Sequence, residues 1–381
     1  MTLPDILPEP VGDGTPLSEL TTMRVGGPAE RVVVAHSTED LARYADELWG
    51  SGEPWLLLGG GSNTVVSDEG FPGTLLLARN TGIAQIDEDP GRVRLRVQAG
   101  HDWDHLVATA ADRGWSGVEA LSGIPGLAGA APVQNIGAYG QELSDVLDSI
   151  EFLDLVRGSV RRIPAAELEL GYRDSAIKRG WEGVVLSIDL VLRDDPRSAP
   201  VRYGQLAAAL GVEPGDRVPL RELREAVLRL RASKGMVLDP ADHDSWSAGS
   251  FFTNPIVSER FARSLPEDAP RFPVGDEEPE PAVTSFEELA AGMPMRIPAL
   301  IEERRVKLSA AWLIEQAGIS RGFRLPGSGA AISGKHTLAI TNRGGASAAD
   351  VAELARFAQQ RVQQEFGVIL APEPNLYGLE L

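Results

Sequence analysis

The first half of the sequence predicts an α+β fold. Short runs of β-branched and other apolar residues alternate there with segments of helical spacing, which is the pattern of strands and helices that follow one another along a chain. The 381 residues allow two or three domains. A chain of this length buries roughly three quarters of its unfolded surface, so it can form more than one hydrophobic core.

The elements of the first half follow from these runs. A helix is predicted over 38–49, with acidic residues in its first turn. A second is predicted over 104–113 and ends at Gly114, because glycine readily adopts the left-handed conformation of a helix C-terminus. Strands are predicted from apolar runs, the last of them strictly alternating, at 31–35, 55–58, 74–78 and 93–98.

Three segments of the chain break the pattern. Residues 193–200 are charged and contain two prolines, so we expect the first domain boundary there. The prolines and acids of 1–18 predict a mobile tail, and the Pro-rich, acidic segment 264–295 predicts a surface insertion that need not pack. Strands are predicted at 149–156, 159–163 and 183–192, and helices at 219–232, 309–317 and 347–366.

Composition excludes several kinds of chemistry. The sequence has no cysteine, which rules out disulfides, Fe–S clusters and cysteine nucleophiles. Lys and Arg number 36 against 55 Asp and Glu, and the formal net charge of −19 repels nucleic-acid backbones. The N-terminus has no basic or apolar leader, and no run of ~18 apolar residues occurs. We therefore expect a soluble cytoplasmic protein that binds neither nucleic acid nor membrane.

A glycine-rich segment follows the strand predicted at 55–58. It consists of Gly59, Gly60, Gly61, Ser62 and Asn63. Glycines let backbone N–H groups approach a ligand without Cβ obstruction, which is what binding a pyrophosphate requires. A dinucleotide-binding loop opens a helix after its glycines, whereas another strand is predicted here. The segment is either a tight hairpin or a nucleotide-binding loop between two strands.

Residues 123–140 form a second segment with little side-chain bulk. Gly, Ala and Pro dominate it, so its backbone can lie flat against a planar ring. Gln134, Asn135 and Tyr139 supply directional polar contacts. The alternative is a close-packed structural turn, but the length of the segment and its interleaved amides favour a ligand.

Two weaker motifs suggest other chemistry. Residues 329–335 nearly match a phosphate-binding loop, but His336 stands where a hydroxyl should bind Mg²⁺, and a strand is predicted to follow instead of a helix. His101 and His105 have the i, i+4 spacing of two metal ligands, yet no third ligand follows at a diagnostic distance. We expect neither NTP hydrolysis nor a bound metal.

Several further motifs stand in a specific order along the chain. They are Thr22-Met-Arg-Val-Gly-Gly27, Leu58-Gly-Gly-Gly-Ser-Asn63, Ile124-Pro-Gly, Gln134-Asn-Ile-Gly-Ala-Tyr-Gly140, Gly171-Tyr-Arg-Asp-Ser175, Gly249-Ser-Phe-Phe252 and Pro372-Glu373. In this combination the chain resembles the UDP-N-acetylenolpyruvoylglucosamine reductases, in the subgroup with a substrate-binding tyrosine loop. The motifs span nearly the whole chain, which makes their order far more specific than any one motif.

The resemblance implies a fold and a domain organisation. It implies an α+β protein in which a two-lobed FAD-binding domain of the vanillyl-alcohol-oxidase (PCMH) type is joined to a C-terminal α+β substrate domain. One lobe would comprise 19–79 together with a C-terminal return, 369–381, and the other 80–200. The substrate-binding domain would comprise 201–368, with the insertion 264–295 inside it.

The resemblance also implies an activity. Family members use NADPH and FAD to reduce the enolpyruvyl ether of UDP-N-acetylglucosamine enolpyruvate, which gives UDP-N-acetylmuramate for peptidoglycan synthesis. The FAD would be non-covalently bound, and the partners would be the UDP-sugar and NADPH, with the protein a monomer. An enol ether is a poor hydride acceptor, so stabilising the developing enolate would be the main catalytic task.

Matching the family's motifs position by position implies roles for individual residues. Arg173, Ser250 and Glu373 match the catalytic positions, Ser250 being the proton donor. Substrate contacts match at Tyr203, Lys234, Asn254 and Gln316. FAD contacts match at Gly59, Gly60, Gly61, Ser62, Asn63, Ile124, Gly126, Gln134, Asn135, Gly137 and Tyr139.

Two other functions stay open at this point. A flavin oxidase of the same fold would act on a substrate unrelated to the cell wall, and such enzymes often tether FAD through His or Cys. The chain has no Cys, and neither glycine-rich segment contains His. A UDP-sugar-binding protein without activity would leave the matched catalytic positions unexplained.

Overall fold

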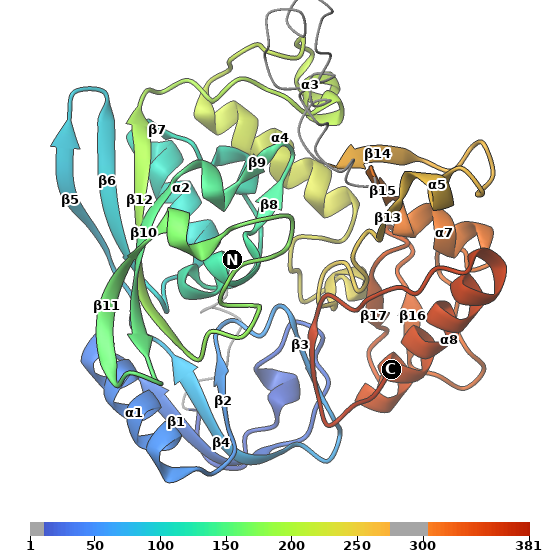
Figure 1. The fold of residues 1–381 in the computed structure, drawn as a ribbon, viewed down its shortest axis with the longest axis horizontal. Coiled ribbons are helices and arrows are strands. Elements are labelled where there is room, and N and C mark those ends of the chain that lie inside the picture. Colours follow the sequence, from blue (N-terminus) through green and yellow to red (C-terminus); the bar gives the residue numbers. More distant parts are fainter. Residues whose placement is uncertain (1–10, 275–303) are drawn as a thin grey trace, which may run out of the picture.

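The computed structural model describes residues 11–274 and 304–381 (Figure 1). Its first unit is a parallel sheet in the order β1 (Ala29–Ala35), β4 (Phe71–Ala78) and β2 (Trp55–Leu58). Helix α1 (Thr38–Ser51) packs against this sheet through Leu41 and Ala45. The strands and the helix predicted for this region are confirmed, although β1 and β4 begin earlier than predicted.

The ends of the first two helices follow from their sequences. Ser37 accepts a hydrogen bond from the Asp40 N–H at the start of α1, which satisfies a backbone donor that the helix leaves free. Helix α2 (Trp103–Arg113) ends at Gly114, whose φ of 78° a side-chain-bearing residue rarely adopts. Both helices therefore lie where local signals predict them.

The second unit is an antiparallel sheet in the order β11, β10, β12, β6 and β5, with β7 paired to β12. The strands are β5 (Ile83–Asp89), β6 (Arg92–Gln98), β7 (Trp115–Ser116), β10 (Leu147–Asp154), β11 (Ser159–Pro164) and β12 (Gly183–Asp194). Trp103, Leu106 and Val107 of α2 are buried against it. Sequence analysis did not predict β5, which is acidic and mostly exposed, or β7, which has two residues.

Two more helices pack beside the second sheet. They are α3 (Gly204–Leu210) and α4 (Leu220–Ser233), of which only α4 was predicted. Leu206 and Val227 are buried in a small cluster with Ala120, which precedes the second glycine-rich segment. Arg224 of α4 donates from both terminal nitrogens to the Asp104 carboxylate of α2, at 2.6 and 2.8 Å. These helices are therefore attached to the second unit.

The third unit has its own core. A small antiparallel sheet runs in the order β13 (Ile256–Ser258), β15 (Arg305–Leu308) and β14 (Arg271–Val274), and β16 (Ala330–Ile332) pairs with β17 (Ile340–Asn342). The helices are α5 (Glu259–Ala262), α7 (Ala310–Gln316) and α8 (Ala348–Phe366). Ser347 caps α8 reciprocally with Asp350. The near-match to a phosphate-binding loop lies in the β16–β17 hairpin and, as predicted, is followed by a strand.

The C-terminal segment returns to the first unit (Figure 1). Strand β18 (Asn375–Tyr377) pairs in parallel with β3 (Thr64–Val66), which directly follows the first glycine-rich segment. Met23, Val25 and Val65 from the N-terminal part are buried in the core of the third unit. The first and third units are thus joined by both pairing and packing.

Two expectations about unpacked segments are wrong in part. Within 264–295, Leu265 and Ala269 are buried in the core of the third unit, and β14 is a paired strand. Within the tail 1–18, the Asp13 carboxylate accepts a hydrogen bond from the Val32 N–H at 2.7 Å, and Leu17 is fully buried. Pro-rich composition therefore did not prevent packing in these parts. Residues 1–10 and 275–295 lie outside the described residues.

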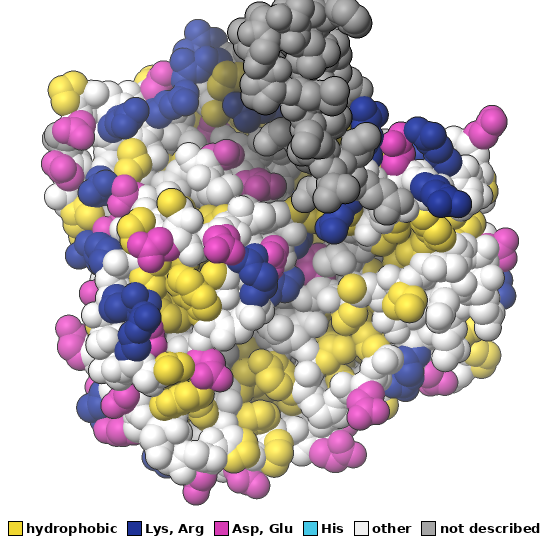
Figure 2. All heavy atoms as spheres, viewed as in Figure 1, with side chains coloured by type: hydrophobic (Ala, Val, Ile, Leu, Met, Phe, Trp, Pro, Cys, Tyr) yellow, Lys and Arg dark blue, Asp and Glu magenta, His cyan; other side chains and the backbone are white. Residues whose placement is uncertain are grey.

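Charge is mixed over the surface. Figure 2 shows Lys and Arg side chains interspersed with Asp and Glu on one face, without a broad basic region. In the described part of the chain, no helix combines the length and apolar character needed to cross a membrane.

Candidate active site

A cavity of about 390 Å³ lies where the three units meet. Both glycine-rich segments line it, together with residues from the turn after β11 and from the third unit. The site residues predicted from sequence that line it are Gly59, Gly60, Gly61, Ser62, Asn63, Ile124, Gly126, Gln134, Gly137, Arg173, Ser250 and Glu373.

The first glycine-rich segment connects β2 to β3, so it is a loop between two strands as predicted. Its backbone is held close to the N-terminal part, because the Thr22 N–H donates to the Gly61 carbonyl at 3.1 Å. Gly61 has φ of 61°, and a Cβ there would lie 2.1 Å from the Leu20 carbonyl oxygen. Only glycine fits at this position.

The backbone of the second glycine-rich segment also packs closely against neighbouring residues. It contains a 3₁₀ helix, Ala128–Gln134, whose start is tied to the strand edge by the Gly129 N–H donating to the Ala99 carbonyl at 2.9 Å. A Cβ on Gly129 would lie 2.6 Å from the Cβ of Ala99. The hairpin β8 (Gly137–Ala138) and β9 (Gln141–Glu142) follows.

Side-chain hydrogen bonds join the two segments. Ser62 Oγ donates to the Pro125 carbonyl at 3.0 Å. The Asn63 amide donates to Gln134 Oε1 and to the Glu373 carbonyl, both at 3.2 Å. Asn63 therefore connects both segments with the C-terminal return, and the walls of the cavity are fixed relative to one another.

Arg173 faces Glu373 across the cavity. Gly171 and Asp174 close a tight turn by two backbone hydrogen bonds, and Arg173 lies inside this turn with φ of 53°. Its Nε lies 3.3 Å from Glu373 Oε1, and its Nη2 donates to the Gly137 carbonyl at 2.9 Å. The guanidinium is thus aimed at the cavity by a backbone conformation that is costly for a residue other than glycine.

Glu373 is a mostly buried carboxyl group. Burial raises its pKa above the ordinary value, and the positive charges of Arg173 and Lys178 act against this rise. Because burial is the largest influence, the neutral acid is favoured more than in a typical glutamate. A neutral carboxyl can donate a hydrogen bond as well as accept one.

Ser250 lines the cavity beside Glu373. The Glu373 N–H donates to the Phe251 carbonyl at 2.9 Å, and Phe252 forms an isolated bridge with Pro372. The rings of Phe251 and Phe252 are fully buried. These contacts hold the Ser250 backbone to the C-terminal return, and within the described residues its hydroxyl has no hydrogen-bond partner.

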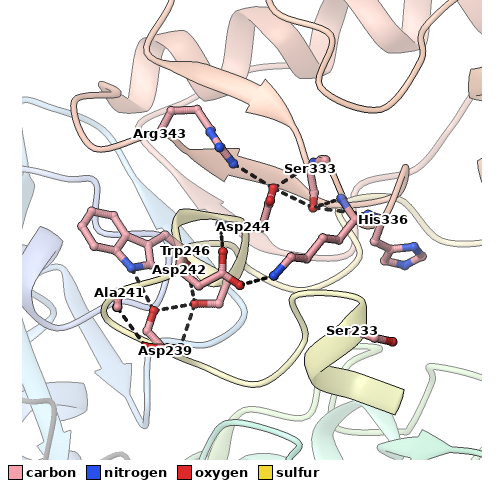
Figure 3. Close-up of polar contacts among 12 residues, drawn as sticks. Ser233, Asp239, Ala241, Asp242, Asp244, Trp246, Ser333, His336 and Arg343 are labelled. Atoms are coloured by element: carbon pink, nitrogen blue, oxygen red, sulfur yellow. Dashed lines mark hydrogen bonds and ion pairs between the residues drawn. The ribbon is translucent and has the colours of Figure 1, made fainter. Parts of the chain in front are cut away.

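The segment that leads to Ser250 is held by a polar network (Figure 3). The Asp244 carboxylate accepts hydrogen bonds from Ser333 Oγ at 3.0 Å and from Arg343 at 2.8 Å. Asp242 accepts a hydrogen bond from Lys335 at 2.6 Å. Segment 239–246 is thereby fixed to the β16–β17 hairpin.

Two residues predicted to contact FAD do not line the cavity. Asn135 is almost fully buried, and its amide bonds to Glu142 Oε2 at 2.9 Å and to the Gly171 carbonyl at 3.1 Å. It therefore braces the Arg173 turn from behind. Tyr139 packs edge to face against Tyr203, with ring centroids 5.5 Å apart.

The four predicted substrate residues lie outside the cavity lining. Tyr203 precedes α3 and is 45% exposed, and Lys234 Nζ lies 5.6 Å from the Tyr139 ring centre. Asn254 donates to the Tyr172 hydroxyl at 3.3 Å, and Gln316 is exposed at the end of α7. Tyr203, Lys234 and Tyr139 thus form one group, from which Asn254 and Gln316 are separate.

The structure adds lining residues that sequence analysis did not identify. Lys178, Arg231 and Trp103 also line the cavity. The only sequence signal for these residues was their proximity to matched positions. Arg231 lies near the end of α4, shortly before Lys234, and Lys178 follows Arg173 in the same loop. Burial lowers the pKa of Arg231 to about 10.

His101 and His105, which have the spacing of two metal ligands, contact each other directly. His101 Nε2 and His105 Nδ1 lie 3.1 Å apart. Among the described residues, no group of three or more potential metal-ligating side chains occurs. Burial lowers the pKa of His101 to about 4.

Two family models match the chain. Residues 29–164 match the FAD binding domain, and residues 239–377 match the C-terminal domain of UDP-N-acetylenolpyruvoylglucosamine reductase. The chain is 58% identical over 378 residues to the UDP-N-acetylenolpyruvoylglucosamine reductase of Leifsonia xyli subsp. xyli, covering 97% of this chain and 100% of that one. The chain belongs to the UDP-N-acetylenolpyruvoylglucosamine reductase family.

Other members of the family match over similar lengths. The reductase of Saccharopolyspora erythraea is 50% identical over 364 residues, covering 95% of this chain and 94% of that one. The crystal structure of the reductase from Thermus caldophilus superposes with a TM-score of 0.60 at 27% identity, covering 96% of this chain and 99% of that chain. The predicted fold, a FAD-binding domain joined to this family's C-terminal domain, is confirmed. None of these matches favours an oxidase.

The cavity fits the cofactor that this family binds. Two glycine-rich loops with little side-chain bulk form part of its lining, as a pyrophosphate and a planar ring require. None of the described lining residues is His, so non-covalent binding is the arrangement that the lining allows.

Proposed function

We propose that this chain catalyses the NADPH-dependent reduction of UDP-N-acetylglucosamine enolpyruvate to UDP-N-acetylmuramate, a step of peptidoglycan synthesis. The observation that carries this proposal is the meeting of Arg173, Ser250 and Glu373 at one cavity walled by two glycine-rich loops. These residues come from three distant parts of the sequence. Relatives along almost the whole chain are named for this reaction.

Both glycine-rich loops would hold the cofactor. Gly59, Gly60, Gly61, Ser62 and Asn63 would bind the pyrophosphate of FAD, and Ile124, Gly126, Gln134 and Gly137 would border its ring system. When bound, FAD takes a hydride from NADPH and supplies it to the enolpyruvyl group. Asn135 and Tyr139 would support these loops from outside the cavity.

Arg173 would stabilise the charge that develops on the substrate. Hydride addition to C3 of the enolpyruvyl group leaves negative charge on C2 and its carboxylate, and a fixed guanidinium matches a carboxylate with two parallel donors. Arg173 is already oriented by Gly137 and by its turn. It therefore needs little reorganisation when this charge appears.

Glu373 would act on the same oxygen atoms in its neutral form. Because burial raises its pKa, the carboxyl can carry a proton and donate a hydrogen bond to the developing enolate. Oε1 of Glu373 lies beside Nε of Arg173, so the neutral carboxyl group and the guanidinium can donate hydrogen bonds to the same part of the cavity. The two groups together would lower the barrier to hydride transfer.

Ser250 would supply the proton to C2. A serine hydroxyl has little bulk, and it can act as an acid where nearby positive charge stabilises its conjugate base. Its hydroxyl is at the cavity and is not engaged by other described residues. Protonation at C2 completes the lactyl ether.

The rest of the assignment concerns binding and organisation. Tyr203, Lys234, Asn254 and Gln316 would contact the UDP-sugar outside the cavity. We propose that the two FAD-binding lobes comprise 19–79 with 369–381, and 80–200, and that 201–368 form the substrate domain, whose first helices, α3 and α4, pack against the second unit. We also propose a cytoplasmic monomer, because NADPH and UDP-sugars are cytoplasmic metabolites.

Stopped-flow spectroscopy of Ser250→Ala tests this function. The variant should oxidise NADPH at the wild-type rate, as seen by bleaching of the flavin bands, and should form product at least about a thousandfold more slowly, in the range of losses for a positioned acid. Ser264→Ala is the control, because Ser264 is an exposed serine of the third unit that does not line the cavity. Loss of both half-reactions together in Ser250→Ala would contradict the assignment.

A further inference from the structure

Lys178 is a charged residue of the cavity that the proposed reaction does not use. It lines the cavity together with Arg173 and Glu373. Its ammonium group donates a hydrogen bond to the carbonyl oxygen of Arg173 at 2.8 Å. Lys178 is an exposed residue, so forming this bond costs its side chain conformational freedom that it would keep in water.

The bonded carbonyl belongs to a residue in an unusual backbone conformation. Arg173 has φ of 53°, in the left-handed region that residues other than glycine, asparagine and aspartate rarely adopt. Such a conformation persists only where the surroundings hold it in place. The hydrogen bond from Lys178 fixes the peptide group that follows Arg173, and thereby the direction of its side chain.

Lys178 is itself anchored to the second glycine-rich segment. Ser175 Oγ donates to the Val133 carbonyl at 2.6 Å, and the Lys178 N–H donates to Ser175 Oγ at 3.1 Å. The main chain of Lys178 is therefore fixed to the wall of the cavity. Its ammonium group reaches back from this anchor to the Arg173 turn.

We propose that Lys178 is a positioning residue of this active site, whose ammonium group holds the Arg173 turn and keeps the guanidinium facing Glu373. The proposal rests on the proposed function. It adds Lys178 to the supports of the Arg173 geometry already described, which are the Gly137 carbonyl on the guanidinium and Asn135 behind the turn.

The same ammonium group also acts on Glu373 through its charge. Among the described residues, the cationic groups that lower the pKa of Glu373 against burial are Arg173 and Lys178. Loss of the Lys178 charge should therefore raise the pKa of Glu373. This pKa therefore reports whether the Lys178 charge acts on Glu373, and the rate of product formation reports whether Lys178 holds the Arg173 turn.

The absence of cysteine in the chain gives a direct experiment. Lys178→Cys introduces a unique thiol, and alkylation with 2-bromoethylamine then restores an ammonium group at the same distance from the backbone. Before alkylation, we expect product formation about 10- to 100-fold slower than wild type, the loss typical of a misplaced catalytic group, with NADPH oxidation unchanged. After alkylation of the same sample, we expect most of the rate to return.

A readout without turnover accompanies this experiment. Carbon-13 NMR of protein labelled at the glutamate side-chain carboxyls, with the signal assigned by Glu373→Gln, gives the pKa of Glu373 directly. We expect this pKa to rise in Lys178→Cys and to return after alkylation. Arg157→Gln is the control, because Arg157 is an exposed cation that pairs with Asp154 in the turn between β10 and β11 and does not line the cavity. It should leave both the rate and the pKa unchanged.

Each outcome is informative. If Lys178→Cys turns over like wild type, or if alkylation restores neither the rate nor the pKa, the proposal is wrong. If Lys178→Cys does not fold, Lys178→Arg replaces it: the retained charge should keep the wild-type pKa of Glu373, and a raised pKa would overturn the proposal. If the wild-type protein itself does not reduce the enolpyruvyl substrate, the proposed function fails, independently of Lys178.

Discussion

The two glycine-rich loops and the four predicted substrate contacts differ in how they are built. The loops, 59–63 and 124–137, line one cavity and are tied together by Ser62 and Asn63. The substrate contacts come from separate elements, lie outside the cavity lining, and include side chains as exposed as Tyr203. The proposed cofactor contacts are therefore preorganised, whereas the proposed substrate contacts come from separate elements.

This difference bears on Arg173 and Glu373, the two proposed catalytic residues with ionisable side chains. Arg173 and Glu373 are attached to the glycine-rich loops through Gly137 and Asn63, and both line the cavity. Groups that stabilise charge in a transition state act best when they are fixed beforehand. Recognition of a flexible UDP-sugar tolerates more mobile contacts. Changes in the loops should therefore affect cofactor binding, and changes outside them substrate affinity.

The largest effect is expected for Gly61→Ala. A Cβ there would lie 2.1 Å from the Leu20 carbonyl oxygen, and such forced overpacking costs about 3 kcal/mol, equivalent to about a hundredfold weaker FAD binding. Gly158→Ala is the matched control, because Gly158 has the same φ of 61° but no atom within 4 Å of the added carbon. Flavin content after purification distinguishes them. Equal content in both variants would contradict a close-fitting loop.

A pH dependence should follow from Glu373. Its pKa is raised by burial, and the neutral acid is the active form, so product formation should be constant below this pKa and fall about tenfold per pH unit above it. Glu373→Gln keeps a hydrogen-bond donor that cannot ionise. It should therefore remove the fall in rate at high pH while retaining part of the rate. Stopped-flow traces of the product-forming step across pH test this. A rate that increases over the same range would require the ionised form.

A smaller effect is expected for Lys234→Met. Lys234 lies outside the cavity near Tyr139 and Tyr203, so its loss should raise the KM for the UDP-sugar about tenfold, typical of a single charge-assisted contact, with little change in kcat. Arg229→Met is the control, because Arg229 is an exposed cation of the same helix. Steady-state kinetics measure both. A fall in kcat without change in KM would place Lys234 in the chemical step instead.

His101 should affect stability without affecting catalysis. Its pKa is about 4 in the folded protein against 6.5 unfolded, so the folded state binds fewer protons between these values. The contribution of His101 to stability should be full above pH 6.5 and decline as the pH falls to 4, over the same range in which buried His336 also contributes. Denaturant unfolding at several pH values should show that His101→Gln reduces this decline. The exposed His36→Gln should not, and an equal reduction by both would exclude His101 as the cause.

Local signals predicted much of the fold but only part of the site. Helix α1 was found from its acidic first turn and apolar spacing, and the first glycine-rich loop from its glycines between two apolar runs. Strands β13, β14 and β15 were missed, because each has three or four residues and pairs with segments distant in sequence. Short strands of this kind depend on tertiary partners that periodicity does not reveal.

The meeting of Ser250 with Glu373 illustrates the limit for the site. The two are joined by the Glu373 N–H and the Phe251 carbonyl, a contact between residues more than a hundred positions apart. No local pattern predicts such a pairing; it was expected only because ordered motifs resemble a known family. Lys178 was missed because its proximity to Arg173 in sequence is a weak signal until the turn conformation is known.

The most direct test of the central claim is an anaerobic visible spectrum of the purified protein, taken before and after NADPH and then after UDP-N-acetylglucosamine enolpyruvate. The proposed function predicts flavin bands that bleach with NADPH and return only when the enolpyruvyl substrate is added. A protein that holds no flavin and cannot be reconstituted with FAD, or whose bleached bands do not return with this substrate, would contradict it.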